Sequence, residues 1–405
     1  MTELLQRDCV VMTLGPGGVG KTTIAAALGV AAARAHLTTA LITVDPAPRL
    51  RDALGLANLG GKPTYLGHQR LRAAGLDHKL RLAAMMLDVS AAWDELIVRF
   101  ATPPARERIL NNRFYRQLTE QFAGAETYAA LATLYDLHDS KEFEALIVDT
   151  PPAADAFDFL RAPARLSRLL DLRAARWLFT PPMSASRLAM GVISRAARFV
   201  LRELEHFAGA GALAAVSDFF VAAQRTLEQI TEQMHKTEAL LHSGAVSFVL
   251  VTTAEEERLR QTRQLIDEMK AEGLVPAALV INRFGDARLW EHLMSEHGAP
   301  MAPWLEAISS LRAALASSLA RAPGLEALVR ALESYRLARH GELERVARWA
   351  HHLPPSLPVV AVPEIWPEVR GLRQVARVAE YLAGPRLRLV QLARRARATQ
   401  AGASL

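Results

Sequence analysis

Short runs of apolar, mostly β-branched residues recur along the chain and alternate with longer segments of helical periodicity. These runs predict strands at Cys9–Leu14, Thr39–Asp45, Leu71–Leu76, Phe143–Asp149, Val246–Thr253, Ala277–Asn282 and Pro358–Val362. Most are apolar throughout, which is typical of strands buried on both faces of a parallel sheet. Helical patterns occupy Thr22–Ala35, Glu255–Glu272 and Gly371–Leu382. The alternation predicts an α/β fold with a doubly wound, mostly parallel sheet that binds ligands at the carboxyl ends of its strands.

Long helical patterns interrupt this alternation at 80–138, 163–242 and 287–354. We interpret them as insertions that form a helical subdomain beside the sheet. The sheet core is then expected from 1–79 together with 139–162, 243–286 and 355–385. Residues 386–405 form a basic tail.

Composition narrows the class of protein. The 405 residues are 51% hydrophobic and 22% charged, which is a globular composition. The single cysteine, Cys9, excludes a disulfide framework within the chain. The polar first residues carry no secretory signal and no apolar run reaches about 18 residues, so we expect a cytoplasmic protein without a transmembrane span.

The net charge of +6 reflects an excess of arginine in the tail. Such a tail could contact nucleic acid or an anionic membrane, or it could be a solvated terminal helix. No aromatic residues are interleaved with its charges, so we expect no nucleic-acid partner.

A glycine-rich loop follows the first predicted strand. Gly15, Gly20, Lys21 and Thr22 match the pattern G-x-x-x-x-G-K-[ST], and a helical pattern follows at once. Glycines let backbone N–H groups curl around phosphate, and the helix presents its positive end to the anion. Lys21 is expected to bridge the β- and γ-phosphates of ATP, and the Thr22 hydroxyl to ligate Mg²⁺. Gly17, Gly18, Val19 and Thr23 complete this predicted ATP site; the alternative is an ordinary glycine turn.

Two of the predicted strands end in a carboxylate, Asp45 and Asp149. A single aspartate at the end of a strand is often a helix cap or a turn former. Two of them in a chain with a phosphate loop favour a metal site made of Thr22, Asp45 and Asp149.

With these motifs the chain resembles the ArsA-type ATPases, which include the arsenite-pump ATPase and the ATPases that target tail-anchored membrane proteins. Beyond the glycine loop, the resemblance is carried by Asp45-Pro46-Ala47, Asp149-Thr150-Pro151-Pro152, Gly124-Ala125-Glu126, Ile281-Asn282-Arg283 and the run Pro363–Leu372.

The resemblance implies roles for these residues. Asp45 would orient the attacking water, and Asp149 would organise Mg²⁺. Asn282, followed by Arg283, would bind the adenine edge, and the loop at Pro363 and Glu364 would cover the ring. The resemblance also implies a homodimer gated by nucleotide.

The chain departs from the family pattern at Pro16, where members usually carry a lysine that reaches the partner's phosphates. Proline has no charge and no N–H, so ATP binding should survive while hydrolysis is slow. Arg49 either replaces this cation or is a solvated loop charge. The cysteines with which the pump captures metalloid and the Cys-x-x-Cys zinc site of the eukaryotic targeting factors are also absent.

A wide apolar stripe at 183–229 contains methionines and phenylalanines. It is either helical core or a surface for a hydrophobic client. The leading hypothesis is a dimeric ATP-hydrolysing switch that captures or delivers a hydrophobic protein or membrane-protein segment. The alternatives are a slow or inactive nucleotide-binding regulator, and a positioning ATPase at membrane or nucleoid.

Overall fold

The structure is a computed structural model of the whole chain. It describes residues 2–44, 49–87, 92–121, 125–151, 160–163, 212–285, 323–351, 353–354, 356–365 and 369–383. Asp45, the tail at 386–405 and most of the stripe at 183–229 therefore lie outside the described residues.

The core is an eight-stranded sheet of order β3-β4-β2-β5-β1-β6-β7-β8. Its strands are β1 Cys9–Leu14, β2 Thr39–Thr43, β3 Thr64–Tyr65, β4 Leu82–Met86, β5 Ala145–Asp149, β6 Val246–Thr252, β7 Pro276–Ile281 and β8 Val359–Ala361. β1 pairs in parallel with β5 and β6, whereas β3 pairs antiparallel with β4. The predicted α/β fold with a mostly parallel sheet is confirmed.

The register brings strand ends together at one edge of the sheet. Thr13 of β1 and Thr43 of β2 both lie opposite Asp149 of β5. All residues of β1, β2 and β5 are buried, as expected for central strands covered on both faces.

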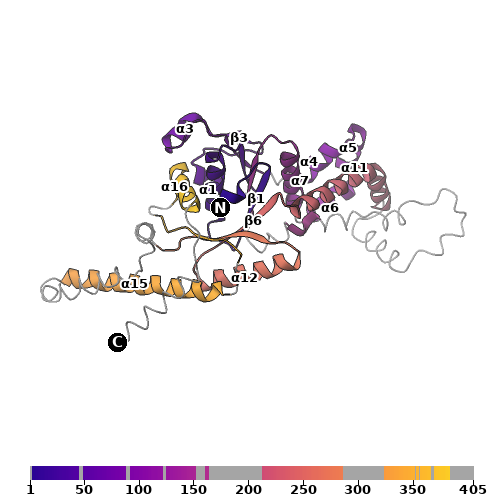
Figure 1. The fold of residues 1–405 in the computed structure, drawn as a ribbon. Helices are drawn as coiled ribbons and strands as arrows, with labels where there is room; N and C mark the ends of the chain where they lie inside the picture. The colour runs from indigo at the N-terminus through magenta and orange to yellow at the C-terminus, as the bar shows by residue number, and fades with distance from the viewer. Residues whose placement is uncertain are drawn as a thin grey trace, which may run out of the picture. The chain divides into compact units, whose positions relative to one another are not determined.

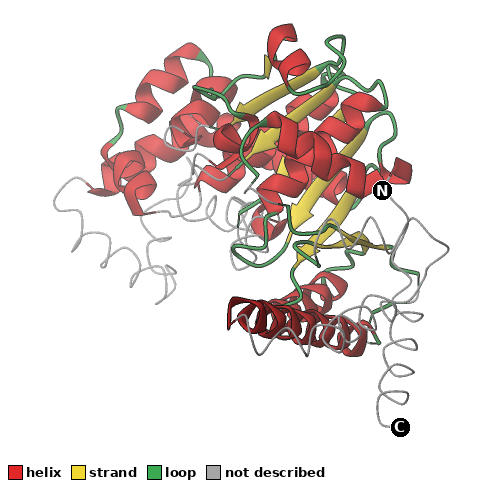
Figure 2. Ribbon diagram, turned by 90° about the vertical axis from the view of Figure 1, so that its left-hand side faces the viewer, coloured by secondary structure: helices red, strands yellow, loops and turns green. Residues whose placement is uncertain are grey.

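Helices cover both faces of the sheet (Figure 2). α1 (Lys21–Arg34) packs against α16 (Leu372–Ala383) on one face, and α12 (Glu256–Ala271) lies on the other (Figure 1). Arg34 of α1 links this helix to α16, because its guanidinium donates to the Ala376 carbonyl at 3.3 Å and to Glu380 at 3.2 Å. The short helices α2 (Arg49–Leu54) and α3 (His68–Ala73) complete this part of the chain before β4.

The predicted strand at Leu71–Leu76 is wrong, because this segment holds α3 and its C-terminal turn. Gly75 has φ 75°, and its N–H donates to Arg72 while the Leu76 N–H donates to the Leu71 carbonyl. This is the Schellman pattern that ends helices. The apolar pair Leu71 and Leu76 thus belongs to a helix terminus.

The strand β4 lies inside 80–138, which the sequence predicts as helical. Its residues Leu-Ala-Ala-Met-Met favour helix by propensity, but the segment is almost wholly buried in the sheet. Tertiary pairing overrides intrinsic preference here.

The chain consists of two compact units: 1–85 with 143–156 and 246–405, and 86–142 with 157–245. Helix α15 (Pro323–Ala350) falls in the unit that holds the sheet, whereas the sequence groups 287–354 with the helical subdomain. One contact between this helix and the sheet is made by Arg345, whose Nε donates to the carbonyl of Ala254, just after β6, at 3.2 Å.

The second unit is helical where described, with α4 Ala92–Phe100, α5 Pro103–Leu110, α6 Arg113–Gln121, α7 Ala125–Asp139 and α11 Ala212–Leu241. Phe219 on α11 packs against Phe114 and Tyr115, with ring centroids 5.4 and 6.0 Å apart. Within 212–229, the described part of the apolar stripe, Phe219, Ala223 and Leu227 are buried at helical spacing and form core, while Val221 is 63% exposed.

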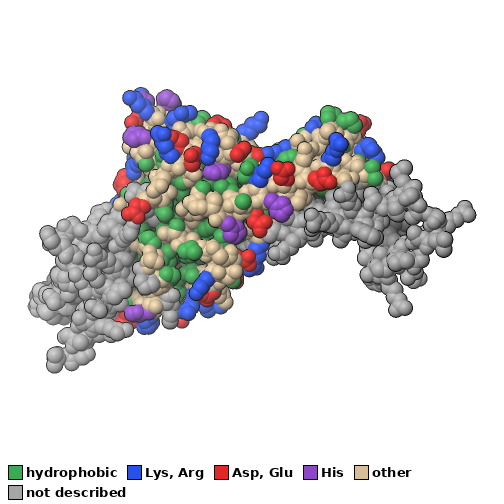
Figure 3. All heavy atoms as spheres, turned by 45° about the vertical axis from the view of Figure 1, so that its right-hand side comes forward, with side chains coloured by type: hydrophobic (Ala, Val, Ile, Leu, Met, Phe, Trp, Pro, Cys, Tyr) green, Lys and Arg blue, Asp and Glu red, His purple; other side chains and the backbone are tan. Residues whose placement is uncertain are grey.

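No helix among the described residues is long and apolar enough to cross a membrane. Basic and acidic side chains are interspersed over the face of the described residues that Figure 3 shows.

Candidate functional site

The glycine loop connects β1 to α1 and depends on backbone shapes that only glycine adopts easily. Gly18 and Gly20 have φ of 77° and 91°, in the left-handed region. A Cβ on Gly15 would lie 2.1 Å from the Val251 carbonyl oxygen of β6. The loop therefore lies against the neighbouring strand, and its amides precede a helix N-terminus, which is the arrangement that binds phosphate.

Lys21 is the first residue of α1, and its side chain turns back across this loop. Its Nζ donates to the carbonyls of Gly15 at 3.0 Å and Pro16 at 3.1 Å. The residue is 8% exposed. This places the ammonium group inside the loop, while Thr22 and Thr23 follow on the first turn of α1, half-buried.

Asp149 is buried at the carboxyl end of β5, 1% exposed. Its Oδ2 accepts a hydrogen bond from the Thr43 hydroxyl at the end of β2, at 3.2 Å. The next residue, Thr150, donates its hydroxyl to the Thr13 carbonyl of β1 at 2.6 Å. The ends of three strands are thus joined beside the glycine loop. The sequence predicts Asp45 as a further member of this group, but that residue lies outside the described residues.

Asn282 follows β7 and reaches the glycine loop. Its Nδ2 donates to the Val19 carbonyl at 2.8 Å, and a Cβ on Gly20 would lie 2.3 Å from the same nitrogen. Its backbone N–H donates to the Thr252 carbonyl of β6 at 2.8 Å. Asn282 is 6% exposed and is therefore a fixed link between the loop and two neighbouring strands.

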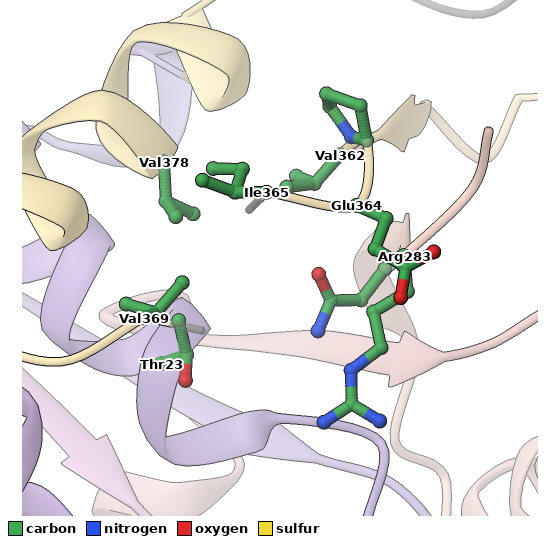
Figure 4. A pocket seen from close by; sticks show the side chains of 9 residues that line it. Thr23, Arg283, Val362, Glu364, Ile365, Val369 and Val378 are labelled. Atoms are coloured by element: carbon green, nitrogen blue, oxygen red, sulfur yellow. The ribbon is translucent and has the colours of Figure 1, made fainter. Parts of the chain in front are cut away.

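A cavity of about 400 Å³ adjoins this asparagine. Ile365, Val369 and Val378 lie on one side of it, and Arg283 and Glu364 on the other (Figure 4). Thr23, Asn282, Val362 and Pro363 complete the lining. Backbone hydrogen bonds hold the walls together, from Phe284 to Val362 and from Glu364 to Gly285, each 2.9 Å long. The structure therefore brings Thr23, Asn282, Arg283, Pro363 and Glu364 to one cavity beside the loop.

Two arginines of the sheet unit differ in their distance from the glycine loop. Arg49 opens α2 and is exposed. Arg258, in the first turn of α12, lies beside the loop, because its Nη2 is 3.9 Å from the position of a Cβ on Gly18. Arg258 was not predicted from the sequence as a residue of this site. Arg258 lies near Gly18 because β6, which precedes α12, is the neighbour of β1 in the sheet. No local sequence pattern indicates this strand order.

A family model described as anion-transporting ATPase matches residues 9–292, well over half of the chain. The chain belongs to this family. The matched range contains the glycine loop, Asp149, Asn282 and the strands β1, β5, β6 and β7. Family and fold together make the chain a P-loop ATPase.

Individual relatives are distant. The chain is 26% identical over 271 residues to ATPase GET3 of Malassezia globosa, covering 66% of this chain and 70% of the relative. It is 29% identical over 182 residues to ATPase get3 of Schizosaccharomyces pombe, covering 44% and 50%. It is also 32% identical over 190 residues to the uncharacterized protein SCO2128 of Streptomyces coelicolor, covering 46% and 44%.

Proposed function

We propose that the chain binds Mg²⁺–ATP with its phosphates in the loop Gly15–Thr23 and its adenine in the cavity beside Asn282. The observation that carries this assignment is the hydrogen bond from Asn282 to Val19, which joins the cavity to the loop. The donor set suits the ligand, because the loop offers amides and an ammonium group to phosphate and the cavity has an apolar side for the base.

Each residue of the proposed ATP site would have its own role. The Lys21 ammonium, held on the Gly15 and Pro16 carbonyls, would pair with the β- and γ-phosphates. The Thr22 hydroxyl and Asp149 would hold Mg²⁺, which supplies charge neutralisation at the transferred phosphate. Asp45 would orient water, and Arg49 would stabilise charge from a second copy of the chain.

Calorimetry of ATP binding with the wild type and with Lys21→Ala tests this assignment. We expect the wild type to bind ATP in the presence of Mg²⁺, and the variant to lose at least about tenfold in affinity, because the loop loses its charge-assisted contact. A wild type that does not bind ATP contradicts the proposal.

We further propose that the chain works as a nucleotide-gated homodimer that captures or delivers a hydrophobic protein segment. The resemblance to targeting ATPases supports this, as do the relatives named ATPase GET3. The test is sedimentation and co-purification with a hydrophobic peptide, in the presence of ADP or of a non-hydrolysable ATP analogue. Capture of peptide by a dimer in one nucleotide state is expected; absence of capture in both states rejects the client.

One observation favours a second function, that of a slow nucleotide-binding regulator. Pro16 occupies the position of the family's lysine, and because proline has no charge it presents no cation to a partner. A steady-state ATPase rate measured beside a lysine-bearing relative separates the two functions, because a regulator binds ATP tightly but turns over far more slowly.

A further inference from the structure

We propose that Arg258 is a phosphate-contacting cation of the nucleotide site, reaching the glycine loop from α12. This inference rests on the proposed ATP site and adds to it a residue outside the loop. The family pattern supplies an extra positive charge from the loop's second position, and Pro16 cannot. Arg258 places such a charge against the same loop by a different route.

The geometry directs one guanidinium nitrogen to the loop. Nη1 donates to Gln261 at 3.1 Å, and Nε lies 3.8 Å from a carboxylate oxygen of Glu255. Nη2 is the nitrogen beside Gly18, 3.9 Å from where a Cβ would stand. Because glycine has no side chain at that point, nothing of Gly18 itself comes between the guanidinium and the loop backbone.

The base of Arg258 is held firmly. Its carbonyl accepts a hydrogen bond from the buried Thr262 hydroxyl at 2.7 Å, and that hydroxyl is 2.9 Å from the hydroxyl of Thr252, the last residue of β6. Residues Val246–Leu250 of β6 pair with β1, the strand that leads into the loop. These contacts therefore hold the backbone of Arg258 next to the strand pair from which the loop emerges.

Two acidic side chains lie near Arg258, and neither neutralises it: Glu257 pairs with Arg260, and Glu255 is only loosely paired with Arg258. The Glu255 side chain is 70% exposed, whereas that of Arg258 is 33% exposed. An exposed pair at this separation contributes little. A triphosphate in the loop would be the stronger partner, since Arg–phosphate hydrogen bonds are charge-assisted and frequently bidentate.

The test compares Arg258→Gln with Arg263→Gln, which removes the same charge from an exposed position on the same helix. Affinities for ADP and a non-hydrolysable ATP analogue are measured by calorimetry at low and high salt, together with melting temperatures without nucleotide. We expect Arg258→Gln to bind the ATP analogue about tenfold more weakly at low salt, and Arg263→Gln to match the wild type. Arg258→Lys should recover part of the loss, because it restores the charge without the planar fork.

Equal affinities in Arg258→Gln and Arg263→Gln, with a wild type that binds, overturn the role of Arg258 and leave the proposed function intact. A lower melting temperature without nucleotide, coupled to an unchanged preference for ATP over ADP, assigns Arg258 a structural role and also overturns the proposal. A wild type that does not bind ATP removes the proposed function and this inference together.

Discussion

The side-chain amide of Asn282 donates a hydrogen bond to the Val19 carbonyl at 2.8 Å, and this contact fixes how the amide is oriented. The carbonyl accepts only, so Nδ2 must face it, and Oδ1 remains as the acceptor of a side chain that lines the cavity. An acceptor at that position suits the exocyclic amino group of adenine and opposes the carbonyl of guanine. One residue would thereby both hold the phosphate loop and read the base.

Replacing Asn282 with Asp tests both roles. The substitution removes the donor and turns an acceptor towards the Val19 carbonyl, which costs about 1–3 kcal/mol or more for a buried group. We expect at least tenfold weaker ATP binding and a wild-type preference for ATP over GTP, both measured by calorimetry. Wild-type affinity in the variant would show that the loop does not need this link.

Gly15→Ala is expected to displace the loop from β6. Its Cβ would lie 2.1 Å from the backbone oxygen of Val251, which cannot turn away as a side chain can. Overpacking of this kind costs roughly 1–3 kcal/mol, so both the melting temperature and ATP affinity should fall. Gly67→Ala is the control, because no atom lies within 4 Å of its Cβ and its φ is −65°. Similar behaviour of the two variants would contradict the close approach.

Pro16→Lys should raise the ATPase rate, since it returns the cation that activation across the proposed dimer would require. An arginine finger accelerates hydrolysis by about 10³–10⁵, which bounds the possible gain. The Pro16 carbonyl that accepts from Lys21 belongs to the backbone, so the substitution leaves this acceptor in the chain. Pro16→Ala is the matched control, because it removes the ring without adding charge. Equal rates in all three proteins would show that the missing lysine does not limit turnover.

Asp149→Asn should uncouple nucleotide binding from Mg²⁺. The amide keeps an oxygen that can accept from Thr43 but lacks the charge that attracts the cation. We expect the gain in ATP affinity on adding Mg²⁺ to shrink about tenfold, as followed by a Mg²⁺ titration. Asp52→Asn, on a side chain that is 62% exposed, should leave the titration unchanged. A normal Mg²⁺ response in Asp149→Asn places the ion elsewhere.

Cys9 offers a reporter of opening in the sheet. Burial is the main cause that raises the pKa of its thiol, so the reactive thiolate is scarce in the folded protein. A thiol reagent should label the only cysteine slowly in buffer and rapidly in denaturant, and a saturating ATP analogue should slow labelling further. Fast labelling of the folded protein would contradict the burial of β1.

The raised pKa of Cys9 also makes the free energy of unfolding depend on pH. Because the folded pKa is raised, the folded thiol stays protonated at a pH where the unfolded thiol ionises. The contribution of Cys9 to the free energy of unfolding should therefore decline as pH rises above about 8.5, the ordinary thiol value. Denaturant unfolding of the wild type and Cys9→Ala across this pH range measures it.

The sequence by itself determined the central strands and the loop. Strands β1, β5 and β6 are made mostly of apolar residues, and glycines with Lys21 at fixed spacing have a chemistry that few other folds use. These signals are local, so neither requires knowledge of the partners. The same local reasoning failed at Leu71–Leu76 and at β4, because a short apolar run does not show whether a helix end or a sheet buries it.

Only the tertiary structure decided which distant residues meet the loop. The strand order places β6 beside β1 and β7 beside β6, and this brings Arg258 to Gly18 and Asn282 to Val19. Residues separated by more than two hundred positions acquire such contacts from strand pairing rather than from any periodicity. The loop could therefore be found in the sequence, whereas the direction of the Asn282 amide and the position of the Arg258 charge depend on how the sheet is assembled.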